Sequence, residues 1–161
     1  MCVIQVSDDE LLFRRVLADG NHVTVDSAQK VRISSNAFGD PGGMPSVDLA
    51  SLCGAAGATW TQEGEENGVL SLETKLVRVV RVIGLTPAPP GSPPNSPKVP
   101  VEHVIDVHHD PVANRPPLRD NPAHAEIRPA PNWCNGSVFK KLKERLALLA
   151  DIVIMPLPLR R

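Results

Sequence analysis

The proline-rich stretch at residues 86–100, T-P-A-P-P-G-S-P-P-N-S-P-K-V-P, limits what this chain can fold into more than any other segment. Seven of its fifteen residues are proline. Proline has no backbone N–H to donate, and it is excluded from helix interiors and from central strands. We therefore expect residues 86–100 to form an extended, polyproline-like loop or insertion within one domain. The P-x-x-P-like segment at 94–97 could dock in an aromatic groove, but connectors without such a reader are far commoner.

The composition fits a single globular domain over residues 1–161. A chain of this length with 42% hydrophobic residues can bury a core without disulfides or metal. Leu, Val and Ile must build that core, because aromatic residues make up only 3% and tyrosine is absent. The net charge of −1 creates no overall field that would attract nucleic acid, which argues against nucleic-acid binding. Its only support is a basic C-terminal group: Lys140, Lys141, Lys143, Arg145, Arg160 and Arg161.

The cysteines and the hydropathy pattern favour a cytoplasmic location. Cys2, Cys53 and Cys134 are widely spaced and form no C-x-x-C pair, which argues against a disulfide framework or thiolate zinc site and favours a reducing environment. The N-terminus has no basic segment followed by a long apolar run, and no stretch of about 18 apolar residues could span a membrane. We expect a soluble, cytoplasmic protein that does not bind membranes.

Two segments have helical periodicity. The first predicts an amphipathic helix over 71–83 with Gly84 as its C-cap, since its apolar residues recur at helical spacing: Leu72, Leu76, Val79, Val80 and Ile83. The second predicts a C-terminal helix over about 137–152, beginning at Ser137 or Asn135, with one apolar stripe: Phe139, Leu142, Leu146, Leu149 and Ile152 or Val153.

The remaining segments predict short elements. Residues 1–6, 22–26, 30–35, 101–107 and 124–129 read as strands, and the second and third of these could pair. Ser7 and Glu10 have capping-box spacing before the apolar residues 11–17, which favours a short helix there, although the same residues could form a strand. Ser46 could cap another short helix through residue 57. The expected fold is α+β, with a small, mainly antiparallel sheet packed against two amphipathic helices and a proline-rich loop.

The stretch H-V-I-D-V-H-H-D-P at 103–111 holds three of the five histidines. On a strand, Asp106, His108 and Asp110 would share one face at about 7 Å between neighbours. Because one strand rarely supplies more than two ligands to one ion, His124 would have to join them in a divalent-metal site. Two other interpretations stay open: an ordinary exposed strand face, which is the commoner case, and metal-free acid–base chemistry by His108 or His124.

A second group of candidate catalytic residues is scattered along the chain. Arg14, the serines Ser34 and Ser35, and Glu126 occur in an order that resembles ADP-ribosyltransferase-like proteins. The resemblance implies an arginine that grips dinucleotide phosphates, a serine-bearing strand that supports the pocket, and a glutamate that stabilises an oxocarbenium-like sugar. The chain lacks that family's Ser-Thr-Ser triplet, its Glu-x-Glu pair and its stacking tyrosine.

A nucleophilic cysteine has little support. Cys53 lies among small apolar residues in L-A-S-L-C-G-A-A-G, which predicts an inert buried thiol, although His108 or His124 could act as its base. Neither a G-x-S-x-G elbow nor a P-loop is present in the sequence.

Three segments together resemble small bacterial proteins: R-I-S-S-N-A-F at 32–38, S-V-D at 46–48 and N-P-A-H-A-E-I at 121–127. The resemblance implies a self-contained module in which residues 86–100 are an insertion, and it implies no particular chemistry. With no complete catalytic motif and nearly zero net charge, we interpret the chain as a small bacterial binding or accessory protein that acts through protein–protein contacts and without a cofactor. An enzyme with one of the two sites described above is the alternative.

Overall fold

The computed structural model describes residues 2–40, 44–131, 136–157 and 159. Its strands are β1 (Leu11–Val16), β2 (Val23–Val25), β3 (Val31–Ile33), β4 (Ser46–Leu49), β5 (Gly68–Glu73), β6 (Arg81–Thr86), β7 (Val99–His109), β8 (His124–Ala130) and β9 (Asp151–Ile154). Its α-helices are α1 (Ala58–Gln62), α2 (Thr74–Arg78) and α3 (Gly136–Leu149), and short 3-10 turns are η1 (Ser35–Phe38), η2 (Ala50–Leu52) and η3 (Gly54–Ala56). The predicted mixture of helix with a mainly antiparallel sheet is confirmed at this level.

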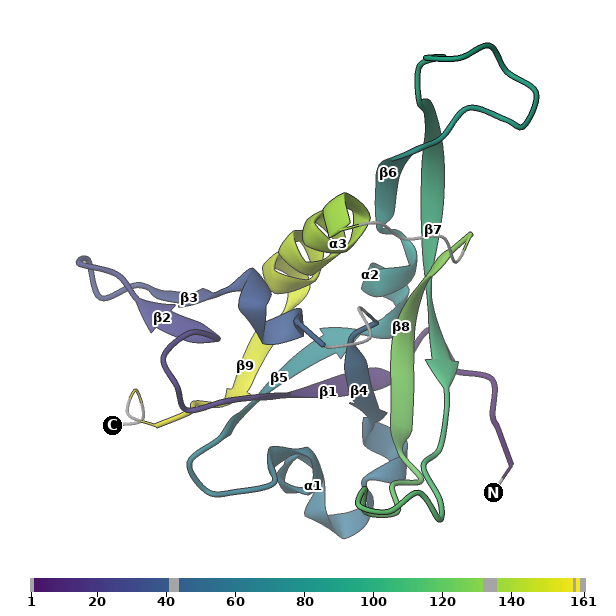
Figure 1. Ribbon diagram of the computed structural model, residues 1–161. Helices are drawn as coiled ribbons and strands as arrows, with labels where there is room; N and C mark the ends of the chain where they lie inside the picture. The colour runs from purple at the N-terminus through teal and green to yellow at the C-terminus, as the bar shows by residue number, and fades with distance from the viewer. Residues whose placement is uncertain (1, 41–43, 132–135, 158, 160–161) are drawn as a thin grey trace.

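Seven strands form one sheet in the order β6-β7-β8-β4-β1-β5-β9 (Figure 1). Every pair of neighbours is antiparallel. The first strand of the chain is therefore interior to the sheet, between β4 and β5. Strands β2 and β3 pair with each other in a separate hairpin, as the sequence predicts.

The two faces of β1 bury different cores because its side chains alternate. Leu12 and Val16 lie in the main core, together with the stripe of α3 formed by Val138, Leu142 and Leu146, all 0% exposed. Phe13 points to the other face, where a smaller cluster contains Cys53 and packs against Trp60 of α1. Helices α3 and α1 therefore lie on opposite faces of β1. The predicted C-terminal helix over about 137–152 extends too far, because α3 ends at Leu149 and Ile152 and Val153 belong to β9. Of the predicted apolar stripe, Leu142 and Leu146 are buried in α3, together with Val138.

Strands β6 and β7 form a ribbon that extends beyond the rest of the sheet (Figure 1). Strand β8 pairs with β7 only from Val104 to His109, whereas β6 pairs with β7 over residues 99–104. The outer half of the ribbon therefore has two strands only. The chain between them, residues 87–98, contains turns but no helix or strand.

The predicted helix over 71–83 is wrong. These residues form the end of β5, the five-residue helix α2 and the start of β6. The apolar residues of β5, α2 and β6 have helical spacing by chance. The β-branched residues Val80, Val82 and Ile83 favour extended structure. Gly84 is no helix cap, because it lies inside β6 where an added Cβ would sit 2.4 Å from Val138 Cγ2.

Three shorter predictions also need correction. Residues 11–17 form β1, the strand alternative, because four of the six residues of Leu11–Val16 are buried in the sheet. Residues 46–57 form β4 and 3-10 turns in place of a helix, because β4 pairs with both β1 and β8. Residues 2–6 form no strand. Arg78 donates a hydrogen bond to Val6 O at 2.7 Å, and His109 Nδ1 accepts one from Ile4 N at 3.0 Å. The predicted strands at 101–107 and 124–129 are confirmed as β7 and β8.

Among the residues with described positions, no helix has the length and apolar character needed to cross a bilayer.

Candidate functional site

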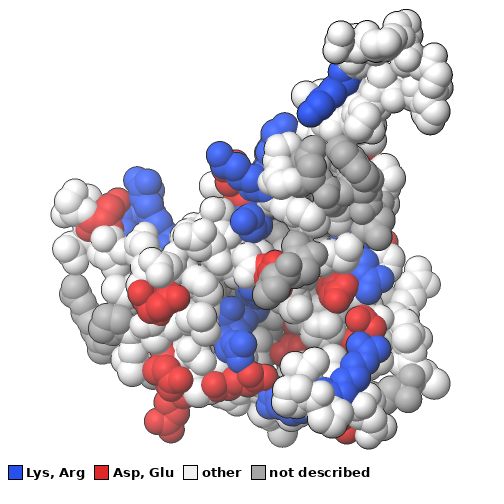
Figure 2. All heavy atoms as spheres, in the orientation of Figure 1, with Lys and Arg blue, Asp and Glu red and all other residues white. Residues whose placement is uncertain are grey.

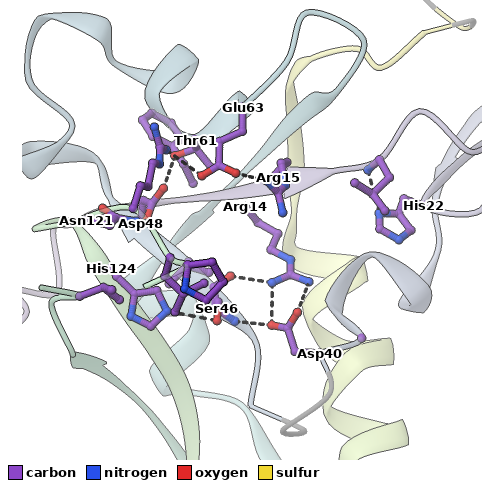
Figure 3. Close-up of a pocket in the computed structure, with 18 residues that line it drawn as sticks. Arg14, Arg15, His22, Asp40, Ser46, Asp48, Thr61, Glu63, Asn121 and His124 are labelled. Atoms are coloured by element: carbon purple, nitrogen blue, oxygen red, sulfur yellow. Dashed lines mark hydrogen bonds and ion pairs between the residues drawn. The ribbon is translucent and has the colours of Figure 1, made fainter. Parts of the chain in front are cut away.

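A pocket of about 710 Å³ lies against β1 and β4 (Figure 3). Residues 112–121, which precede β8, and the end of α1 form its other walls. Ser46 and Asp48 on β4 and Arg15 on β1 supply part of its polar lining. The same pocket contains Arg14 and His124, two of the side chains predicted from sequence.

Arg14 is a structural anchor at one side of the pocket. Its two terminal nitrogens form a forked pair with Asp40, at 2.7 and 3.0 Å, and the guanidinium also donates to the backbone oxygens of Ala37 and Ser46, each at 2.8 Å. The side chain is only 9% exposed. These bonds occupy four of the five N–H donors of the guanidinium, so Arg14 has little capacity left to grip a pyrophosphate.

Ser46 and His124 meet beside Arg14 (Figure 3). His124 Nε2 lies 3.2 Å from Ser46 Oγ, and His124 Nδ1 lies 2.7 Å from the carbonyl oxygen of Asp110. The pairing of β4 with β8 brings the two side chains together, because Asp48 is the cross-strand partner of His124 and Ser46 that of Glu126. A hydroxyl, an imidazole and a carbonyl therefore form a chain that ends in the pocket.

Asp48 is held in place by neutral donors. Its carboxylate accepts hydrogen bonds from Thr61 Oγ1 at 2.7 Å and from Asn121 Nδ2 at 2.8 Å, and Asp48 is 7% exposed. Asn121 in turn accepts from Trp60 Nε1 at 3.1 Å. This network fixes α1 and the segment before β8 against β4, and it satisfies a buried carboxylate without a positive charge.

The outer rim is more exposed. Glu63 pairs with both Arg15 and Arg119, and the Arg119 guanidinium lies 4.3 Å from the centre of the Trp60 ring. At the far end, His22 Nδ1 accepts a hydrogen bond from Leu17 N at 3.0 Å. Burial lowers the pKa of His22, although the nearby carboxylate of Asp19 acts in the opposite direction. The lowered pKa favours the neutral form of His22.

The charges that line the pocket balance. Three arginines face three carboxylates: Arg14, Arg15 and Arg119 with Asp40, Asp48 and Glu63. Figure 2 shows the same mixture on the surface, where Lys and Arg alternate with Asp and Glu over the face in view. Such a site does not concentrate a strongly anionic ligand, since no excess of either sign creates a directed field.

The pocket contains only one of the residues of the ADP-ribosyltransferase-like arrangement. Arg14 lines the pocket, whereas Ser34, Ser35 and Glu126 are not among its lining residues. Ser34 caps η1 by accepting from Asn36 N at 3.2 Å, and Ser35 begins that turn. Glu126 accepts from Arg128 Nε at 2.9 Å on β8.

The proposed metal ligands lie on one face of the β7–β8 pair but are engaged with other groups. Asp106 binds Arg78 at 2.8 Å, and Asp110 lies 3.9 Å from Arg128. His108 is the cross-strand partner of Glu126, and the ring of His124 is turned toward Ser46. Within the described part of the chain, no group of three or more His, Cys, Asp or Glu residues is placed to hold a metal ion.

The other two histidines of the 103–111 stretch face the core, as strand alternation predicts. His103 is 0% exposed, with Nδ1 3.0 Å from Pro131 O. His109 is 7% exposed, with Nε2 2.7 Å from Pro122 O and Nδ1 accepting from Ile4 N. Both rings contact backbone oxygens, and Nε2 of His103 is buried without a hydrogen-bond partner among the described residues.

Ser46, Asp48 and Asn121 are pocket residues that the sequence reasoning did not assign to a site. The sequence predicts Ser46 as a helix cap, whereas in the structure it is the first residue of β4. The available signal was the pair of segments S-V-D and N-P-A-H, at 46–48 and 121–124, which supplies Ser46, Asp48, Asn121 and His124 to one pocket.

Cys53 has the buried environment that its apolar neighbours predict. The residue is 4% exposed, and its thiol donates to Leu49 O at 3.4 Å. Burial raises the pKa of Cys53 to about 11, and the neighbouring carboxylate of Asp48 acts in the same direction. The thiol is therefore protonated and unreactive at neutral pH.

Cys53 should be alkylated much more slowly than an exposed thiol in the folded protein. At pH 7.5, iodoacetamide should modify Cys53 about 100-fold more slowly in the folded protein than in urea, because the reactive thiolate is depleted by its raised pKa. Peptide mass spectrometry measures both rates, and exposed Cys2 is the internal control that should react readily in both states. Equal rates for Cys53 and Cys2 in the folded protein would contradict the burial of Cys53.

Comparison with known proteins gives no relative for this arrangement. No protein-family model matches the chain, and neither the curated proteins nor the solved structures contain a match. The site must therefore be interpreted from its own geometry.

Proposed function

We propose that this protein is a small bacterial binding or accessory protein that acts through contacts with a partner protein. The observation that carries the proposal is an exposed apolar strip on the outer face of the β6–β7 ribbon, called here the ribbon face and formed by Ile83, Leu85 and Val104. These side chains are 54%, 49% and 44% exposed. They fall on one face because they alternate with the inward Val82 and Gly84 and because Arg81 is the cross-strand partner of Val104.

The chemistry of the ribbon face favours a protein partner. Exposed apolar strips bordered by polar residues are typical of protein–protein contact surfaces. Here both signs of charge lie among the apolar side chains, since Arg81 is the cross-strand partner of Val104, Glu102 is that of Ile83, and the two charged groups lie 3.8 Å apart. A nucleic acid would need an excess of positive charge, so the partner expected here has an apolar strip with mixed charges at its edge.

The structure favours contact through the ribbon face over addition of a strand to the edge of β6. Lys141 of α3 donates to the backbone oxygen of Ile83 at 2.8 Å and covers part of that edge. Covering a strand edge with a helix is a common obstacle to strand addition. The free thiols of Cys2 and Cys53 further support a cytoplasmic location for such an accessory protein.

A photo-crosslinking experiment tests this proposal. A photoreactive phenylalanine analogue replaces Ile83 or Val104, and in the control it replaces Val153 on β9, which is 47% exposed at the opposite edge of the sheet. In extracts of the source cells, the two ribbon positions should give the same heterologous cross-linked protein. Excess unlabelled protein should compete for it, whereas the same protein carrying Leu85→Asp should not.

Three results would overturn the proposal: no cross-linked product, the same product from Val153, or a cross-link only to a second copy of this chain. The last result would identify the ribbon face as a self-association surface.

The ADP-ribosyltransferase-like and metal-site alternatives receive less support. Arg14 is already engaged by Asp40 and by two carbonyl oxygens, and the pocket charges balance. Asp106 is paired with Arg78.

A further inference from the structure

We propose that Ser46 and His124 form a nucleophile–base pair for acyl transfer in the pocket, an activity separate from the proposed partner binding. The pair has the arrangement that an activated serine requires, namely a base within hydrogen-bond reach and a third group that orients the base. The serine–histidine distance is 3.2 Å and the histidine–carbonyl distance is 2.7 Å.

The carbonyl of Asp110 determines which nitrogen of His124 is basic. A carbonyl oxygen can only accept a hydrogen bond, so Nδ1 of His124 must carry the proton that it donates to Asp110 O. In the neutral ring, Nε2 is then an unprotonated acceptor, and it faces the hydroxyl of Ser46. Deprotonation of Ser46 by His124 needs no rotation of the imidazole, because the two groups are already hydrogen-bonded.

The backbone of Ser46 is fixed on both sides. Its N–H donates to Asp40 Oδ2 at 2.6 Å, and its carbonyl accepts from Arg14 Nη1 at 2.8 Å. The forked Arg14–Asp40 pair therefore acts as a positioning unit for the serine.

The reaction would proceed in two balanced steps. In the first, Ser46 Oγ attacks the carbonyl carbon of an ester as its proton moves to His124 Nε2. The tetrahedral intermediate then expels the alcohol, which takes the proton from Nε2, and an ester on Ser46 remains. In the second step, water attacks this ester with His124 again as base, releasing the carboxylic acid and restoring the Ser46 hydroxyl and neutral His124.

The pocket indicates a small ester with little net charge as the substrate class. Its volume of about 710 Å³ suits a small molecule. Its balanced charges do not favour a polyphosphate, whereas Val112, Pro117 and Leu118 provide an apolar wall for an acyl or alkyl group.

A serine-reactive fluorophosphonate probe tests the proposal directly. The probe should label the intact protein once, and peptide mass spectrometry should place the adduct on Ser46. The Ser46→Ala variant should show no labelling, and His124→Gln should lower the labelling rate at least about 100-fold, since general-base assistance contributes about that factor or more. As a matched control, Ser92→Ala in the exposed 87–98 segment should label at the parent rate.

Circular dichroism and thermal unfolding show whether each variant remains folded. An adduct on any other residue in the parent, or no adduct on folded parent, would refute the pair. Parent-like labelling of folded His124→Gln would refute the role of His124 as base. If His124→Gln fails to fold, His124→Asn provides the rate comparison, and the location of the parent adduct still decides the role of Ser46.

Discussion

Replacement of Arg14 by alanine is expected to lower the free energy of unfolding by about 3–5 kcal/mol, as for other buried ion pairs from which one partner is removed. The side chains of Arg14 and Asp40 are 9% and 22% exposed, and the loss would leave Asp40 and two carbonyl oxygens without their shared donor. Urea unfolding at neutral pH measures the change. Because Asp40 has some access to water, we expect a value near the lower end of this range.

A double-mutant cycle measures the interaction free energy between Arg14 and Asp40 apart from their contacts with other groups. The Asp40→Ala variant and the Arg14→Ala/Asp40→Ala variant should show a coupling free energy of at least about 1 kcal/mol, because both members share one forked contact. The Arg14→Lys variant should recover only part of the stability, since lysine lacks the planar fork. A loss below about 0.5 kcal/mol for Arg14→Ala would mean that the pair contributes no more than a surface salt bridge.

Replacement of Leu142 by alanine should cost about 2–5 kcal/mol of unfolding free energy, the usual range for a leucine truncated in a packed core. Leu142 is 0% exposed in the main core, where α3 covers the sheet. Leu148→Ala is a matched control on the same helix, because Leu148 is 81% exposed and should change stability by less than about 0.5 kcal/mol.

Chemical denaturation of both variants under identical conditions gives the comparison. Similar costs for Leu142→Ala and Leu148→Ala would contradict the orientation of α3, because the two truncations would then remove equally buried side chains.

Sequence patterns predicted those elements whose periodicity lies within one element. Helix α3 has 14 residues and buries Val138, Leu142 and Leu146 on one face. Strand alternation likewise divided His103 and His109 from Asp106 and His108. The same reasoning failed over 71–83, where residues of β5, α2 and β6 mimic a helical repeat. Short apolar runs have this ambiguity because tertiary packing decides between helix and strand.

The candidate site was less accessible to sequence reasoning because its parts meet through long-range pairing. Ser46 and His124 are 78 positions apart, and only the pairing of β4 with β8 makes them neighbours. His124 was identified as a candidate from its chemistry, but its partner could not be chosen among the serines without the strand order. Arg14 was predicted to grip a phosphate, whereas in the structure it pairs with Asp40, a contact that depends on how β1 and the segment before β4 approach each other.

The interior position of β1 has a consequence for how the protein folds. Strands β4 and β5, the neighbours of β1 in the sheet, are synthesised before β8 and β9, which come from residues 124–130 and 151–154. We therefore expect a three-stranded unit of β4, β1 and β5 to have two unpaired edges until β8 and β9 are made. Contacts between distant parts of a chain form slowly. Until they form, unpaired strand edges can pair with other chains. The newly made chain should therefore be most prone to aggregation after β5 has formed and before β8 has left the ribosome.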